Sequence, residues 1–123
     1  FVKYGQVQDM DLGYASMVPV VRMAEMYLIA AECEDSKATA YGWLNALRSA
    51  RKATSLPATG TLSNDLTEEY IREFVGEGQL FWYYKRLRKT SIRKVYSNNG
   101  GYLEFDPANY LFALPEKEQE HHK

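Results

Sequence analysis

The sequence predicts a mainly α protein with tetratricopeptide-like antiparallel helices, irregular loops and at most a short β hairpin. Three segments carry apolar residues at the spacing that lines one face of a helix, and each has helix-start or helix-end signals. A cluster of asparagine and glycine near the end precedes a strand-like stretch. The 123 residues suffice for one core, and no apolar run approaches the roughly 20 residues of a membrane span.

The first helix is predicted over residues 19–34. Pro19 suits the first helical position, because its missing N–H is not needed there. Residues 1–18 lack helical periodicity and are expected to be extended or looped. One apolar face follows at helical spacing, made of Val20, Ala24, Tyr27, Leu28 and Ala31.

The second helix is predicted over residues 37–53. The pair Asp35-Ser36 can cap its start, and Arg48 places positive charge near its end, where the helix dipole favours cations. Gly42 lies inside it at a cost of about 1 kcal/mol relative to alanine. Two explanations stay open for this glycine: a close approach of another backbone, or a tolerated weak spot.

The third helix is predicted over residues 68–89, after a loop over residues 54–64. Thr67 is its expected cap, and basic residues crowd its end, which matches the helix dipole. Gly78 is expected to mark a close approach. The predicted apolar stripe consists of Ile71, Phe74, Val75, Gly78, Phe81 and Trp82.

The rest of the chain reads as a turn, a strand and an apolar end. Residues 97–101 form a strong turn signal, and residues 102–105 are strand-like. Residues 110–115 are apolar and expected to be extended before a charged tail.

Charge argues against a polyanion partner. The net charge of −1 provides no global field toward nucleic acid or an anionic membrane. Residues 85–94 do hold six Lys or Arg and no acid, beside four aromatic residues at 81–84, which is a pattern of single-strand binding. Helix ends favour such cations anyway, and Phe81 and Trp82 are expected in the core. No nucleic-acid partner is therefore predicted.

No metal site, cofactor or catalytic residue is predicted. His121 and His122 are adjacent on the tail and lack the spacing of a preorganised metal site. Cys33, the single cysteine, is expected to be a partly buried helix residue. Glutamates fall on shared helix faces, namely Glu25 with Glu32, and Glu69 with Glu73 and Glu77. Their expected use is ion pairing with Arg22, Arg48, Arg51 and Arg72.

The ten tyrosines raise the possibility of sugar binding, because an aromatic ring packs on the apolar face of a pyranose. Residues expected to be partly exposed are Tyr83, Tyr84, Tyr96, Tyr102 and Tyr110. Carbohydrate-binding residues stay unknown, because spacing does not show which rings share a surface.

Four segments resemble the SusD/RagB family, the surface glycan-binding lipoproteins of Bacteroidetes. Residues 22–32 are similar to its helix signature, and residues 40–51, with Leu44-Asn45-Ala46-Leu47-Arg48, to its next helix. Residues 72–78 resemble its acidic Glu-Gly helix, and residues 114–118 its terminal Leu-Pro segment. Leu80 and Tyr83 replace an arginine and an aspartate common in the family, and His121-His122 follow where it has Asn-Pro. These departures indicate a divergent branch.

The resemblance implies a non-enzymatic nutrient-uptake protein of a starch or polysaccharide utilisation system. It would lie on the outer membrane through an amino-terminal lipid absent from this chain, bind oligosaccharides and work with a SusC-like TonB-dependent transporter. Residues 1–123 are expected to be the carboxy-terminal helical part of a longer chain. Structural roles are implied for Arg22, Glu25, Glu32, Asn45, Arg48, Glu73 and Glu77. The alternative is a tetratricopeptide-like scaffold for protein–protein interaction.

Overall fold

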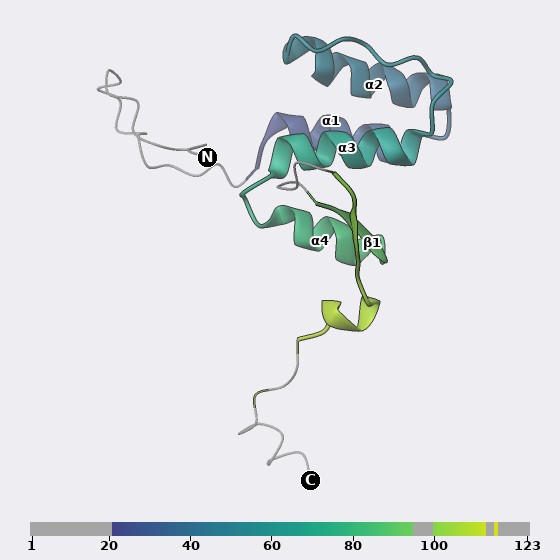
Figure 1. Ribbon diagram of the computed structural model, residues 1–123. Helices are drawn as coiled ribbons and strands as arrows, with labels where there is room; N and C mark the ends of the chain where they lie inside the picture. The colour runs from purple at the N-terminus through teal and green to yellow at the C-terminus, as the bar shows by residue number, and fades with distance from the viewer. Residues whose placement is uncertain (1–20, 95–99, 113–114, 116–123) are drawn as a thin grey trace, which may run out of the picture. The chain divides into compact units, whose positions relative to one another are not determined.

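The computed structural model describes residues 21–94, 100–112 and 115. Within them it contains four α-helices, a short 3₁₀ helix and a two-stranded antiparallel sheet (Figure 1). The chain divides into two compact units, Phe1–Glu77 and Gly78–Lys123. The mainly α class with a short β hairpin is confirmed.

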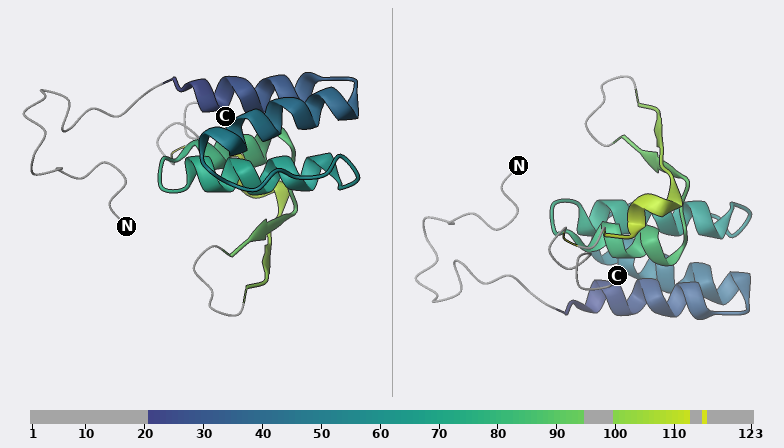
Figure 2. Two further views of the ribbon diagram at one scale, coloured as in Figure 1. Left: turned by 90° about the horizontal axis from the view of Figure 1, so that it is seen from above. Right: turned by 90° about the horizontal axis from the view of Figure 1, so that it is seen from below.

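The first unit is built on three packed helices. Helices α1 (Met23–Cys33) and α2 (Lys37–Ala50) are joined by three residues and lie side by side in both views of Figure 2. Helix α3 (Leu62–Phe74) packs against both of them. The buried apolar side chains are Ala24, Leu28, Ala31, Ala40, Tyr41, Leu44, Leu47, Leu66, Tyr70, Ile71 and Phe74.

Side-chain contacts fix the direction of α3. Tyr41 near the start of α2 bonds Asp65 near the start of α3, and Arg51 just after α2 pairs with Glu73 near the end of α3, so these helices run parallel. Arg22, just before α1, bonds Glu73 near the end of α3, so α1 and α3 run antiparallel. A long segment over residues 51–61 returns along α2 to allow this arrangement (Figure 1).

The first two helices begin and end close to the predicted residues. Helix α1 occupies residues 23–33 of the predicted 19–34, and Pro19 and Val20 lie outside the described residues. Helix α2 begins at the predicted residue, and the Ser36 hydroxyl accepts from the Thr39 N–H at 3.4 Å, which confirms the cap. It ends three residues early, because Lys52 adopts a left-handed φ of 57°.

The prediction of one helix over residues 68–89 is wrong. Helix α3 already begins at Leu62 and ends at Phe74, and a separate helix α4 (Gln79–Arg86) follows. Gly76 and Gly78 between them have φ values of 79° and 78°, which a right-handed helix cannot contain. Thr67 is not a cap: it lies within α3, and its hydroxyl donates to the Ser63 carbonyl at 2.7 Å.

Gly78 was expected near another backbone, and for Gly42 a close approach and a tolerated weak spot were both open. A Cβ atom placed on Gly42 or on Gly78 would have no neighbour within 4 Å among the described residues. Gly42 is therefore the tolerated weak spot of α2. Gly78 is needed for its left-handed backbone conformation, which L side chains rarely adopt.

The second unit combines α4 with a hairpin and a 3₁₀ turn. Strand β1 (Ser91–Arg93) pairs with β2 (Tyr102–Glu104), and Ile92 lies opposite Leu103. The strand expected over residues 102–105 is confirmed in β2, whereas residues 95–99 of the turn lie outside the described residues. Segment η1 (Pro107–Tyr110) follows. Tyr110, the first residue of the apolar segment that was expected to be extended, therefore lies in a 3₁₀ helix.

Candidate functional site

Arginines and glutamates of the first unit form ion pairs between helices. Glu73 accepts from Arg22 and from Arg51, each at 2.8 Å, and Glu77 accepts from Arg22 at 2.9 Å. The Arg22 guanidinium also lies 5.0 Å from the centre of the buried Phe74 ring. One arginine thus ties the start of α1 to the end of α3.

A second ion-pair group centres on the buried Glu69 of α3. Its carboxylate accepts from Arg48 of α2 and from Arg72 one turn further along α3. Arg72 also lies 3.8 Å from Glu68, and Arg48 donates to the Thr54 carbonyl at 2.8 Å. All four arginines that the sequence offered as ion-pair partners pair with glutamates, which confirms the predicted use of Glu69, Glu73 and Glu77.

Two further residues that the family resemblance marked, Asn45 and Glu32, make hydrogen bonds within the first unit. The Asn45 side chain accepts from the Leu56 N–H and donates to the Leu56 carbonyl at 2.8 and 2.9 Å, which holds the loop after α2. Glu32 accepts from the Tyr70 hydroxyl at 3.4 Å. Glu25 is half-buried in the first turn of α1.

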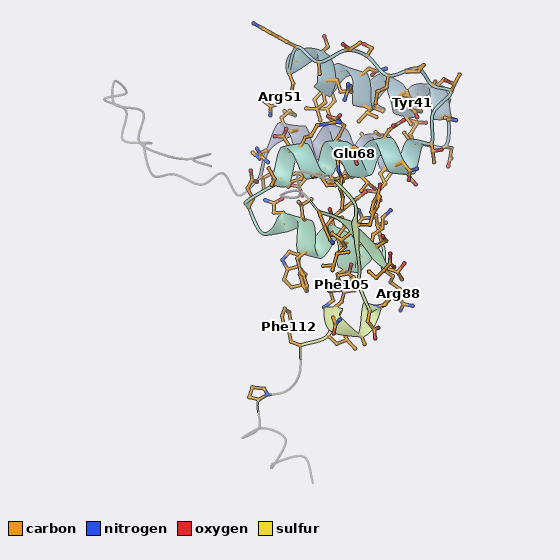
Figure 3. All side chains as sticks on the ribbon, viewed as in Figure 1. Tyr41, Arg51, Glu68, Arg88, Phe105 and Phe112 are labelled. Atoms are coloured by element: carbon orange, nitrogen blue, oxygen red, sulfur yellow. The ribbon has the colours of Figure 1, made fainter. Side chains whose placement is uncertain are left out.

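Tyr41 of the first unit has a raised pKa. It is buried on α2, where Figure 3 labels it, and its hydroxyl donates to Asp65 at 2.5 Å. Burial, the hydrogen bond to Asp65 and the negative charge of Asp65 together raise the pKa of Tyr41 from 10.0 to about 12, and burial contributes most. The phenol therefore stays protonated at neutral pH and serves packing.

Most tyrosines considered for sugar stacking are not available. Tyr83, Tyr84 and Tyr110 are buried, contrary to expectation, and the Tyr110 hydroxyl donates to the Lys89 carbonyl at 2.9 Å. Burial raises the pKa of Tyr110 above its usual value. Tyr102 on β2 is 64% exposed as expected, and Tyr96 lies outside the described residues.

Trp82, in contrast to these buried tyrosines, is exposed. It was expected in the core, yet 59% of it is exposed. The expectation assumed that one helical phase continued from Ile71 to Trp82. The turn between α3 and α4 resets that phase, so α4 buries Tyr83 and Tyr84 and turns Trp82 outward.

Four residues form what we call the aromatic–cation cluster: Phe81, Trp82, Lys85 and Phe112. The Phe81 ring lies 5.2 Å from that of Trp82 and 5.6 Å from that of Phe112. The Lys85 Nζ lies 5.5 Å from the centre of the Trp82 ring and 5.9 Å from that of Phe112. Phe112, on the segment after η1 (Figure 3), is 76% exposed.

The partly buried Phe81 supports this cluster. Its ring also lies 5.7 Å from the ring of Tyr110, which in turn lies 4.6 Å from the ring of Phe105. A continuous aromatic packing thus connects the interior of the second unit to two exposed rings. Such supported rings suit a ligand with an apolar face.

The residues considered for metal binding or nucleophilic catalysis form no cluster in the part of the chain that the structure describes. Cys33 at the end of α1 is exposed rather than partly buried, and His121 and His122 lie outside the described residues. Among the described residues, no three His, Cys, Asp or Glu side chains gather to hold a metal ion. None of the helices in this part of the chain has the length and apolar character to cross a membrane.

Comparison with protein-family models gives a match over most of the chain. The model of the SusD family matches residues 1–121 of the 123-residue chain. No curated protein and no solved structure matches the sequence. The matched range includes both the ion-paired helices and the aromatic–cation cluster.

Proposed function

The chain belongs to the SusD family, and on that premise we propose that it is a non-catalytic glycan-binding component of an outer-membrane nutrient-uptake system. In this proposal it works with a SusC-like TonB-dependent transporter and is held at the cell surface by an amino-terminal lipid. The family match over residues 1–121 is the observation that carries the proposal.

Two features of the structure support a binding role rather than catalysis. The glutamates at residues 69, 73 and 77 accept from arginines and hold helices together, so they are not positioned as a general acid and base. The exposed rings of Trp82 and Phe112, in contrast, offer apolar faces of the kind that sugars pack against.

The test is isolation of the native protein from its own cells. We expect it in the outer-membrane fraction, purifying with a TonB-dependent transporter and retained in gels that contain the polysaccharide it helps import. Recovery from the cytoplasm, with no such transporter encoded beside it, would refute the proposal.

A protein-interaction scaffold is the second candidate, favoured by the outer face of α1. Met23, Met26 and Ile29 are exposed there, and the exposed Trp43 of α2 meets Tyr27 edge-on with ring centres 5.8 Å apart. Exposed apolar side chains of this kind are common at protein interfaces. The coding sequence upstream of Phe1 decides between the candidates: a lipid-modified cysteine supports the first, and repeats of about 34 residues support the second.

A further inference from the structure

We propose that the aromatic–cation cluster binds an acidic sugar unit, whose ring face packs on Trp82 and whose anionic group pairs with Lys85. This inference rests on the proposed glycan-binding function and names both a site and a ligand class for it. It is carried by three observations: two exposed rings, an ammonium group held over both, and the absence of Asp and Glu from residues 78–103.

The first observation is that the exposed rings are positioned by the fold. Phe81 contacts both Trp82 and Phe112 from the partly buried side, with ring centres 5.2 and 5.6 Å away. A ligand that stacks here meets side chains whose orientation is already restricted. Preorganised contacts of this kind lose less conformational entropy when the ligand binds.

The second observation is the position of the Lys85 ammonium. Its nitrogen lies within 6 Å of both exposed ring centres, and the side chain is half-buried. A cation over a ring face is attracted by the ring, but the ring accepts no conventional hydrogen bond. The N–H donors of Lys85 can therefore reach a carboxylate or sulfate on a sugar stacked beside it.

The third observation is the local charge. Residues 78–103 hold six Lys or Arg and no Asp or Glu, although the whole chain carries a net charge of −1. An anionic polysaccharide would be attracted to this segment, and salt would weaken the attraction. A chain whose net charge is nearly neutral thus contains a segment in which all charged side chains are positive.

Single-stranded nucleic acid shares the stacking surface and the negative charge. A sugar fits better, because the cluster has two exposed rings and one central ammonium rather than a groove that follows a backbone, and because the family binds nutrients. Nucleic-acid binding is an outcome that the experiment must detect.

The experiment measures binding of the whole protein by isothermal titration calorimetry against five probes: polygalacturonate, its methyl ester, dextran sulfate, dextran and oligodeoxythymidine. We expect the acid to bind about tenfold more tightly than its methyl ester, which corresponds to about one charge-assisted hydrogen bond. Comparison of dextran sulfate with dextran shows whether sulfate replaces carboxylate. Equal binding of acid and ester, together with equal binding of dextran sulfate and dextran, overturns the proposal, and so does preference for the oligonucleotide.

Two variants and two matched controls locate the site. Trp82→Ala should weaken binding of the preferred acidic probe about tenfold by removing the stacking surface. Lys85→Met keeps the aliphatic stem and should abolish the preference for the charged probe over its uncharged form. Tyr102→Ala and Lys94→Met remove an exposed ring and an exposed cation of the same unit and should change affinity less than about twofold.

The outcomes separate this proposal from the function on which it rests. If the protein binds uncharged glycans and purifies with a transporter but shows no preference for acidic probes, the ligand class is wrong and the proposed function stands. If controls and site variants weaken binding equally, the site is wrong. If it binds no polysaccharide and has no transporter partner, both proposals fail.

Discussion

The two compact units use cations in opposite ways. In the first unit, arginines at residues 22, 48, 51 and 72 meet carboxylates between and along packed helices. In the second unit, Lys85 lies over the rings of Trp82 and Phe112. Carboxylates satisfy a cation's donors, whereas ring faces leave donors for a ligand. Cations therefore stabilise the helix packing of the first unit, whereas Lys85 of the second unit keeps donors for a ligand.

This difference predicts where substitutions act. Changes to the buried side chains of the first unit should lower the free energy of unfolding. Changes to the exposed rings and cations of the second unit should leave it nearly unchanged and affect binding instead.

The largest expected effect is Phe74→Ala. Phe74 is buried in α3, stacks on Tyr70 with ring centres 5.7 Å apart, and lies under the Arg22 guanidinium. Its truncation should lower the free energy of unfolding by about 3–5 kcal/mol. Urea unfolding measures this, and Leu103→Ala at an exposed β2 position should cost less than about 0.5 kcal/mol. A change as small as that of the control would mean that the core is wrongly assigned.

Next in size is Glu69→Ala, which leaves two arginine side chains without their shared carboxylate. Because Glu69 and Arg48 are both nearly buried, the loss should be about 3 kcal/mol. Arg51→Ala is the matched control: Arg51 is mostly exposed, and Glu73 retains Arg22 after its removal. It should cost about 0–1 kcal/mol in the same denaturation assay. Equal losses for both variants would contradict the distinction between buried and exposed pairs.

Two glycine substitutions should have opposite signs. Gly78→Ala places a Cβ at a φ of 78° and should cost about 1–2 kcal/mol. Gly42→Ala has free space inside α2 and should raise stability by about 0.5–1 kcal/mol. Thermal unfolding of the two variants tests whether backbone conformation at residue 78 separates α3 from α4. A stabilising Gly78→Ala would argue for a continuous helix.

A single hydrogen bond is tested by Tyr41→Phe, which removes the bond to Asp65 and should cost about 1 kcal/mol at neutral pH. The folded-state pKa of Tyr41 is raised from 10.0 to about 12. Between those values the unfolded chain loses this proton while the folded protein keeps it, so stability falls as pH rises. The stability difference between wild type and variant should therefore shrink toward pH 12. A constant difference in urea titrations across this range would show that Tyr41 does not titrate as described.

Local patterns predicted much of the first unit. Apolar spacing and the Ser36 cap placed α1 and α2 within a few residues of their observed bounds, because these signals act within a single helix. The ion pairs of α3 could also be predicted from the sequence, because glutamates four residues apart share one face of a helix.

The break between α3 and α4 escaped the same reasoning. The apolar residues from Ile71 to Trp82 satisfy a single helical period, so the pattern gives no sign of an interruption. The signal was the pair Gly76 and Gly78, whose two left-handed φ values end one helix before the next begins.

The sequence predicts only part of the aromatic–cation cluster. Lys85 follows Trp82 by one helical turn, which the spacing shows. Phe112 reaches the same surface through the path of the hairpin and η1, and no local spacing encodes that path. The prediction that Tyr83, Tyr84 and Tyr110 are partly exposed failed for a related reason. A phenol is amphipathic, so it can be buried where the tertiary structure provides a hydrogen-bond partner, as the Lys89 carbonyl does for Tyr110.

The two tryptophans of the chain fall one to each unit, Trp43 on α2 and Trp82 on α4. Each unit thus contains its own intrinsic fluorophore. Trp43→Phe leaves an emission signal from the second unit alone, and Trp82→Phe leaves one from the first. Coincident melting curves from these two single-tryptophan proteins would identify one cooperative folding unit, and separate curves would identify two.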